Sequence, residues 1–221
     1  MNKKQKVSLV LNCLIFIFTV FATISMLTGF EFMSGERIFT ASSYKAFKYF
    51  TVDSNVFAGL ISLIYMIYLC LLSKGKIKEL PKCLHYLKLA ATTGVTLTMM
   101  VTVCFLAPRA ASYFALFMNS NLFMHLVTPL LCIVTFAFFE PAKLSFKESF
   151  LGTCPMILYA LYYIPNILLH LDNGKVSPMY DWYGFLLGGL HTIWFVIPLL
   201  LLITWAFSIC LWCINKKCAN K

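Results

Sequence analysis

"KYFTVDSNVFAGLISLIYMIYLCLL", the segment Lys48–Leu72, decides the fold because a polar boundary leads directly into a long apolar run. From Asn55 to Leu72 the run contains no charged residue. A helix of about 20 apolar residues crosses the roughly 30 Å hydrocarbon layer of a bilayer, so this run is predicted to span a membrane. The boundary holds four polar residues that either start the helix or belong to a chemical site: Thr51, Asp53, Ser54 and Asn55.

The composition of the whole chain agrees with a membrane-spanning protein. Of the 221 residues, 61% are hydrophobic and 12% are charged, whereas soluble domains have about 45–50% apolar and about 25% charged residues. A soluble domain of this length cannot bury so much apolar surface. The net charge of +10 does not indicate nucleic-acid binding, because the basic residues cluster in the loops.

Six apolar runs are long enough to cross the bilayer. We therefore predict an all-α polytopic membrane protein with one six-span transmembrane domain over residues 1–221. The first run is longer than the apolar region of a signal peptide, which has about 7–15 residues, so it is interpreted as an uncleaved span. The predicted spans are Val7–Phe30, Asn55–Leu72, Leu84–Leu106, Asn119–Phe139, Phe150–Leu169 and Gly184–Ile214.

The distribution of Lys and Arg predicts the orientation of these spans. Cytoplasmic loops carry an excess of basic residues. With the N-terminus inside, thirteen of the 18 basic residues fall on the cytoplasmic side, Lys88 and Lys221 among them. The outer side then has Arg37, Lys45, Lys48, Arg109 and Lys175. We predict a multi-pass protein of the cell membrane with both termini cytoplasmic.

Two further segments have a predicted structural role. The outer loop Glu31–Ser54 alternates aromatic residues such as Phe39 with charges, so it is predicted to lie in the membrane interface. The sixth predicted span begins "GFLLGG", in which Gly184 and Gly188 are spaced as in a small-xxx-small face for close helix packing.

Polar side chains are predicted to converge in the outer leaflet. Polar residues inside spans are costly in lipid, so they face the bundle interior and suggest a functional site. His125, His170 and His191 belong to three different spans and lie near the outer end of each. No comparable group is predicted in the inner leaflet, and His85 is expected to be solvated in a cytoplasmic loop.

Proline adds a backbone feature to the fourth span. Pro129 has no N–H to donate to the carbonyl of His125, four residues earlier, so a kink is predicted there. In lipid the freed carbonyl must find a partner or line a cavity.

A threonine hydroxyl and a histidine at similar depth in the membrane indicate nucleophilic chemistry. The Thr51 hydroxyl is the candidate nucleophile and His125 the candidate base that accepts its proton. Alternative interpretations remain open: Thr51 or Asp53 caps the helix, His125 makes a hydrogen bond across helices, and the other histidines are packing groups. The candidate substrate-binding residues, some of them possible oxyanion donors, are Asn55, Asn121, His170 and His191.

No metal or cofactor is predicted. The sequence has no P-loop, G-x-S-x-G or H-E-x-x-H motif. Cys210 and Cys213 form a lone C-x-x-C pair on an apolar helix end, which is weak evidence for zinc.

Three stretches together resemble a known family. They are "FKYFT", which ends at Thr51, "MHLVTP", which contains His125, and "HLDNGKVSPMYDW", which begins at His170. They resemble the androgen-induced/FAR-17a family of six-span membrane proteins, including its bacterial branch. The resemblance implies hydrolysis of fatty acid esters of hydroxy fatty acids, with Thr51 as nucleophile and His125 as base.

The chain departs from the hydrolases of that family after Thr51, where Val52–Asn55 is more polar. Two functions therefore stay open from the sequence. The first is a hydrolase of a lipid or fatty acid ester. The second is a non-catalytic transporter or a lipid- or solute-binding protein that uses the same pocket. A purely structural subunit is a third possibility, and the sequence does not define an oligomeric state.

Overall fold

The computed structural model describes residues 1–34, 43–110, 112–186 and 188–218, which fold as an all-helical bundle. Within these residues, six helices are long and apolar enough to cross a membrane, which confirms the predicted number of spans. Arg37 and Phe39 of the predicted interfacial loop and Lys221 at the C-terminus lie outside the described residues. The six helices are Lys3–Thr28, Phe50–Ser73, Lys82–Arg109, Ser120–Phe139, Lys147–Leu169 and Leu190–Cys218.

Only the first two spans, α1 (Lys3–Thr28) and α2 (Phe50–Ser73), are single α-helices. The others combine α-helix with 3₁₀ or π turns. The third consists of α3 (Lys82–Val101), a π segment (Thr102–Leu106) and a 3₁₀ turn (Ala107–Arg109). The fourth consists of α4 (Ser120–Leu122), a π segment (Phe123–Val127), α5 (Thr128–Val134) and a π segment (Thr135–Phe139). The last two are a 3₁₀ turn (Lys147–Thr153) with α6 (Cys154–Leu169) and a 3₁₀ turn (Leu190–Thr192) with α7 (Ile193–Cys218).

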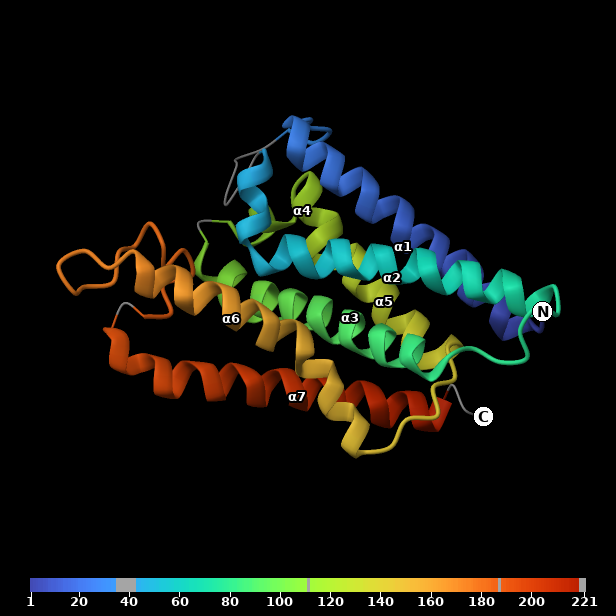
Figure 1. The fold of residues 1–221 in the computed structure, drawn as a ribbon. Coiled ribbons are helices and arrows are strands. Elements are labelled where there is room, and N and C mark those ends of the chain that lie inside the picture. Colours follow the sequence, from blue (N-terminus) through green and yellow to red (C-terminus); the bar gives the residue numbers. More distant parts are fainter. Residues whose placement is uncertain (35–42, 111, 187, 219–221) are drawn as a thin grey trace.

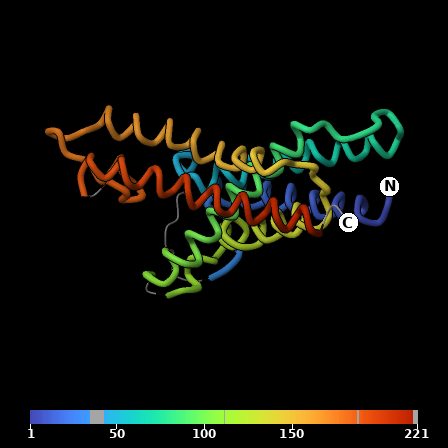
Figure 2. The backbone as a smooth tube through the Cα atoms, turned by 90° about the horizontal axis from the view of Figure 1, so that it is seen from below, coloured from blue at the N-terminus to red at the C-terminus, as the bar shows by residue number. Residues whose placement is uncertain are grey.

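The third span lies at the centre of the bundle. Its most apolar window is 61% buried, whereas that of the sixth span is 11% buried. The segment Lys88–Thr98, "KLAATTGVTLT", is buried throughout, and its small side chains let neighbouring helices approach closely. Figure 1 shows α3 between α2 and α7, with both termini at one end of the bundle, and Figure 2 shows the same placement of the termini from below.

Each π segment precedes a proline, and the two features are connected. In a π turn the N–H of residue i+5 donates to the carbonyl of residue i. Pro108, Pro129 and Pro141 each follow such a segment and have no N–H, so each leaves the carbonyl five residues earlier without its backbone donor. Each of these carbonyls receives a side-chain donor instead. Tyr113 Oη donates to Val103 O (3.3 Å), Asn55 Nδ2 to Met124 O (2.9 Å) and Asn215 Nδ2 to Phe136 O (2.5 Å).

The irregularity predicted at Pro129 is therefore present, but as a π turn. The sequence indicated the carbonyl of His125 as the freed group because an α-helical register was assumed. In the observed register Thr128 N–H donates to Phe123 O, so the next carbonyl, that of Met124, is the one opposite the proline nitrogen. The freed carbonyl is buried in the bundle and satisfied, as a lipid environment requires.

The start of the sixth span differs from its prediction. The helix begins at Leu190, six residues after the predicted start at Gly184. Gly184 and Gly189 have positive φ values of 68° and 106°, which a helix does not contain, so neither belongs to the helix of the sixth span. The predicted helical small-xxx-small face of Gly184 and Gly188 is therefore wrong. The first helix begins earlier than predicted, at Lys3, because Asn2 and Gln5 form a capping box.

Candidate functional site

A cavity of about 310 Å³ lies at the end of the bundle opposite the termini. We call it the Thr51 cavity. The end of α1, the start of α2 and the start of the fourth span surround it, together with the loop before the sixth span. Thr51, His125 and Asn121 all line it, so the structure brings three of the predicted site residues together. The apolar part of its wall includes Met26, Phe30, Val52, Leu106, Leu116 and Met124.

Thr51 is not a helix cap. The N-cap of α2 is Tyr49, and no side chain of the helix caps it, so the capping interpretation of Thr51 and Asp53 is wrong. The N–H of Phe50 donates instead to the hydroxyl of Tyr183, at 2.8 Å. Within the described residues the Thr51 hydroxyl makes no hydrogen bond, and it is available to a molecule in the cavity.

Tyr183 belongs to the loop before the sixth span, and its ring also lines the cavity. Burial raises the pKa of its phenol to about 12, and this is the largest contribution to the shift. The hydroxyl is therefore uncharged near neutral pH. A neutral phenol both accepts the Phe50 N–H and keeps its own proton to donate.

His125 is held in one tautomer. The ring is buried and its Nδ1 lies 3.0 Å from the carbonyl oxygen of Leu116, in the 3₁₀ helix Tyr113–Phe117. A carbonyl only accepts, so Nδ1 carries the proton and Nε2 of the neutral ring is the basic nitrogen. The partner is a backbone group just before the fourth span and not a side chain of another span. This arrangement suits a general base.

The two asparagines have different roles. Asn55 donates its side-chain N–H groups to Thr51 O (2.8 Å) and Met124 O (2.9 Å), so neither is free for a ligand. Asn55 is absent from the cavity wall, so the structure does not place it with the other predicted substrate-binding residue of this region, Asn121. Asn121 lines the cavity, and its side chain makes no hydrogen bond within the described part of the chain. It is the available amide donor.

His170 and His191 do not reach the cavity, so the predicted convergence of three histidines is wrong. His170 is exposed at the end of α6 and stacks on Tyr180, with ring centroids 3.9 Å apart. Its Nδ1 bonds to Asn166 O at 2.7 Å. His191 is exposed in the first turn of the sixth span. Its depth was misjudged because that span begins later than predicted.

Aromatic residues that the sequence prediction missed form one side of the cavity. Tyr49, Trp182 and Tyr183 line it, and the ammonium of Lys48 lies 5.1 and 5.0 Å from the ring centroids of Tyr49 and Trp182. Asp181 fixes this loop by accepting hydrogen bonds from the N–H groups of Phe185 (3.0 Å) and Leu186 (2.8 Å). The dense aromatics of "YDWYGF" were a signal for this role.

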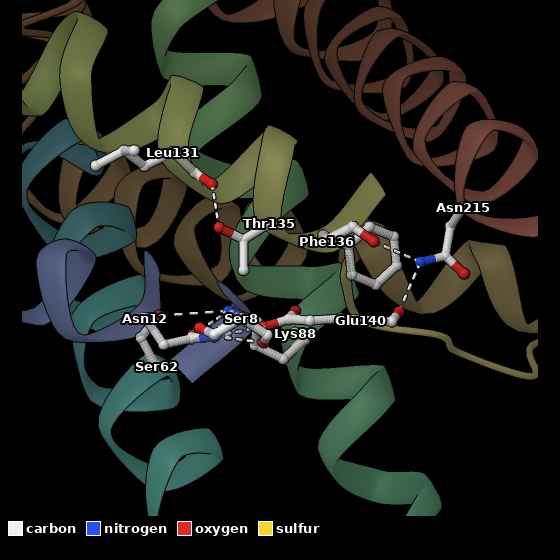
Figure 3. Close-up of polar contacts among 9 residues, drawn as sticks. All are labelled: Ser8, Asn12, Ser62, Lys88, Leu131, Thr135, Phe136, Glu140 and Asn215. Atoms are coloured by element: carbon white, nitrogen blue, oxygen red, sulfur yellow. Dashed lines mark hydrogen bonds and ion pairs between the residues drawn. The ribbon is translucent and has the colours of Figure 1, made fainter. Parts of the chain in front are cut away.

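A second polar group lies nearer the termini, where the sequence predicted none (Figure 3). We call it the Lys88 cluster. Its members belong to the first three spans or, in the case of Glu140, directly follow the fourth. They are at most 2% exposed and are Ser8, Asn12, Ser62, Lys88 and Glu140. The sequence counted Lys88 among the basic residues of the cytoplasmic side, near the start of the third predicted span, but α3 begins six residues before it and buries it.

Hydrogen bonds join the members of the Lys88 cluster. Lys88 Nζ donates to Asn12 Oδ1 at 2.8 Å and lies 3.3 Å from Ser62 Oγ. Asn12 Nδ2 donates to Glu140 Oε1 at 2.6 Å, and Ser8 Oγ donates to the same oxygen at 3.3 Å. Asn215 of α7 donates to the backbone carbonyl of Glu140 at 2.8 Å. The cluster therefore connects five spans.

Two other predictions concern smaller features. His85 is not simply solvated: it is half-buried, and its ring centroid lies 6.4 Å from that of Tyr65. Among the described residues no group of three or more His, Cys, Asp or Glu side chains could hold a metal ion.

Comparisons of the chain with protein-family models, with curated proteins and with solved structures found no match. The roles proposed below therefore rest on the geometry of the cavity and on the short motifs quoted above.

Proposed function

We propose that this protein is an integral membrane hydrolase of a lipid or fatty acid ester, with Thr51 as nucleophile and His125 as general base. The observation that supports it is the shared cavity: an unbonded Thr51 hydroxyl and a tautomer-fixed His125 line the same space. The cavity volume of about 310 Å³ is close to the lower limit of small-molecule sites, about 300–1,000 Å³. Its apolar wall suits an acyl chain.

The proposed reaction has two stages. Thr51 Oγ1 attacks the ester carbonyl carbon while its proton passes to His125 Nε2. The bond to the alcohol oxygen then breaks, His125 returns the proton to that oxygen, and an acyl-threonine remains. Water attacks the acyl-threonine and gives a proton to His125. The proton finally passes to Thr51 as the fatty acid leaves.

Asn121 is the proposed donor to the oxyanion that forms in each stage. Its amide N–H groups are the ones left unused near His125, whereas those of Asn55 are occupied. Donors of this kind act mainly where charge develops in the transition state.

The proposed location is the cell membrane with both termini cytoplasmic, which puts the Thr51 cavity in the outer leaflet. The positive-inside distribution supports this, since Lys74, Lys76, Lys78 and Lys143 lie in loops at the end of the bundle that holds the termini, and Lys147 is the first residue of the fifth span. A C-terminal fusion to green fluorescent protein should fluoresce, and one to alkaline phosphatase should be inactive. The reverse pattern contradicts this orientation.

Labelling with a fluorophosphonate probe tests the reaction. The probe phosphonylates an activated hydroxyl: the hydroxyl oxygen attacks phosphorus, and fluoride leaves. We expect Thr51 to be the labelled residue by peptide mass spectrometry, with labelling lost in Thr51→Val and His125→Ala. Ser120→Ala is the matched control, because Ser120 also presents a hydroxyl to the cavity. Undiminished labelling in Thr51→Val contradicts the assignment.

A non-catalytic transporter or lipid- or solute-binding protein is the second candidate. The buried Lys88 cluster supports it, because ionisable residues inside spans often mark substrate or ion pathways. The sequence predicted no such group at the end of the bundle that holds the termini, where the Lys88 cluster lies. Uptake of a solute into proteoliposomes that persists in Thr51→Val and stops in Glu140→Gln would favour this candidate.

A further inference from the structure

The carbonyl of Met124 has lost its backbone partner one residue before His125. The π turn pairs Thr128 N–H with Phe123 O, and the same register would pair Pro129 with Met124 O. Proline has no N–H to supply. A buried carbonyl without a donor is costly inside a membrane bundle, so the site needs a donor from elsewhere.

Asn55 supplies that donor from α2. Its Nδ2 lies 2.9 Å from Met124 O, and it also donates to Thr51 O at 2.8 Å. The side chain is 1% exposed, so water does not compete for these bonds. A single amide group thus joins the backbone of Thr51 to the residue that precedes His125.

We infer that Asn55 is a positioning residue that sets the placement of Thr51 relative to His125 by replacing the hydrogen bond that Pro129 removes. The inference rests on the proposed function. Asn55 does not touch the cavity and takes no part in proton transfer. Its effect comes through the backbone, because a small displacement of a nucleophile from its base is enough to slow a reaction strongly.

Variants of two other residues distinguish a positioning role of Asn55 from a general contribution to helix packing. Asn215 plays the same part as Asn55 at a different place: it donates to the carbonyl of Phe136, which Pro141 leaves free, near the Lys88 cluster. Ser54 Oγ also donates to Thr51 O (3.2 Å), and it lies 3.1 Å from the hydroxyl of Thr98 in α3. Asn215→Leu and Ser54→Ala therefore remove comparable buried bonds that do not connect Thr51 with the fourth span.

The experiment measures fluorophosphonate labelling of Thr51 in purified full-length protein, separated into the reversible binding constant and the maximal labelling rate. Asn55→Leu should lower the maximal rate about 100-fold, the size of effect that a displacement of about 1 Å produces. The binding constant should change less than about threefold, since the cavity wall is intact. In Ser54→Ala and Asn215→Leu, a maximal rate within about threefold of wild type is expected.

A double variant tests the link to Pro129. Pro129→Ala restores an N–H that can serve Met124 O, so adding Asn55→Leu to it should change the maximal rate less than about threefold. This comparison also serves if Asn55→Leu alone does not fold. A loss of tenfold or more in that background, or a wild-type rate in Asn55→Leu, overturns the positioning role. Absence of Thr51 labelling in the wild type overturns the proposed reaction and this role together.

Discussion

Nζ of Lys88 lies 3.4 Å from Oε1 of Glu140, and both side chains are at most 2% exposed within the bundle. Breaking a buried ion pair by removing one partner leaves an uncompensated charge, which typically costs about 3–5 kcal/mol. We therefore expect Lys88→Met and Glu140→Gln each to lower the free energy of unfolding by about this amount. Thermal unfolding in detergent micelles, followed by tryptophan fluorescence, measures the change.

The double variant Lys88→Met/Glu140→Gln is the informative comparison, because it removes both charges. It should be more stable than either single variant. The exposed pair Lys82–Glu148, with Nζ and Oε1 at 2.5 Å, provides the control. Lys82→Met should change the unfolding temperature little, since solvent screens that pair. A double variant as unstable as the worse single variant would contradict the ion-pair explanation.

The number of spans was predictable because each apolar run is long, and length and hydropathy alone define a crossing. The run after Gly184 was misjudged because its apolar composition continues through a loop that only backbone φ values reveal. Thr51 and His125 line one cavity, and their similar depth was expected from residue counting. His191 was misplaced with the helix that carries it.

The Lys88 cluster shows what a positive-inside count misses. A lysine near the end of a span is predicted to face solvent on the cytoplasmic side. Its burial becomes predictable only when an acidic partner from another part of the bundle is known. Glu140 lies just before Pro141, at the end of the fourth span, so nothing local in the sequence pairs it with Lys88. The role of Asn55 was hidden for a related reason, because it depends on a π register that the sequence does not display.

Tyr183→Phe should weaken the start of α2. The variant removes the oxygen that accepts the Phe50 N–H and leaves that partly buried donor without a partner. The expected loss is about 1–3 kcal/mol in the free energy of unfolding, with slower labelling of the adjacent Thr51. Tyr49→Phe is the control, since Tyr49 also lines the cavity but caps α2 through its backbone. Equal stability of the two variants would contradict the capping role.

Tyr183 should also make the stability of the folded protein depend on pH. The pKa of Tyr183 is raised from 10.0 to about 12 in the folded protein, chiefly by burial. A raised pKa stabilises the folded state fully below the unfolded value, and this contribution is lost as the pH rises through the folded value. The Tyr183 contribution should therefore be constant below pH 10 and disappear between pH 10 and about 12. Unfolding temperatures of wild type and Tyr183→Phe, measured across this range, should converge as the pH rises.

Variants of Asn121 and His170 test whether the reaction depends on the observed cavity or on the predicted histidine cluster. Asn121 lines the cavity beside His125, whereas His170 stacks on Tyr180 outside it. If Asn121 stabilises the oxyanion, Asn121→Ala should lower ester turnover about 100- to 1,000-fold, the usual cost of losing one such donor. Asn121→Asp should not restore it, because a carboxylate accepts and does not donate.

His170→Ala is the matched control for Asn121→Ala. Turnover of a fatty acid p-nitrophenyl ester within about twofold of wild type is expected, since no part of His170 reaches the reacting groups. A large loss in His170→Ala with an intact fold would mean that the loop after α6 closes over the cavity during the reaction. That result would restore the histidine to the site that the sequence assigned to it.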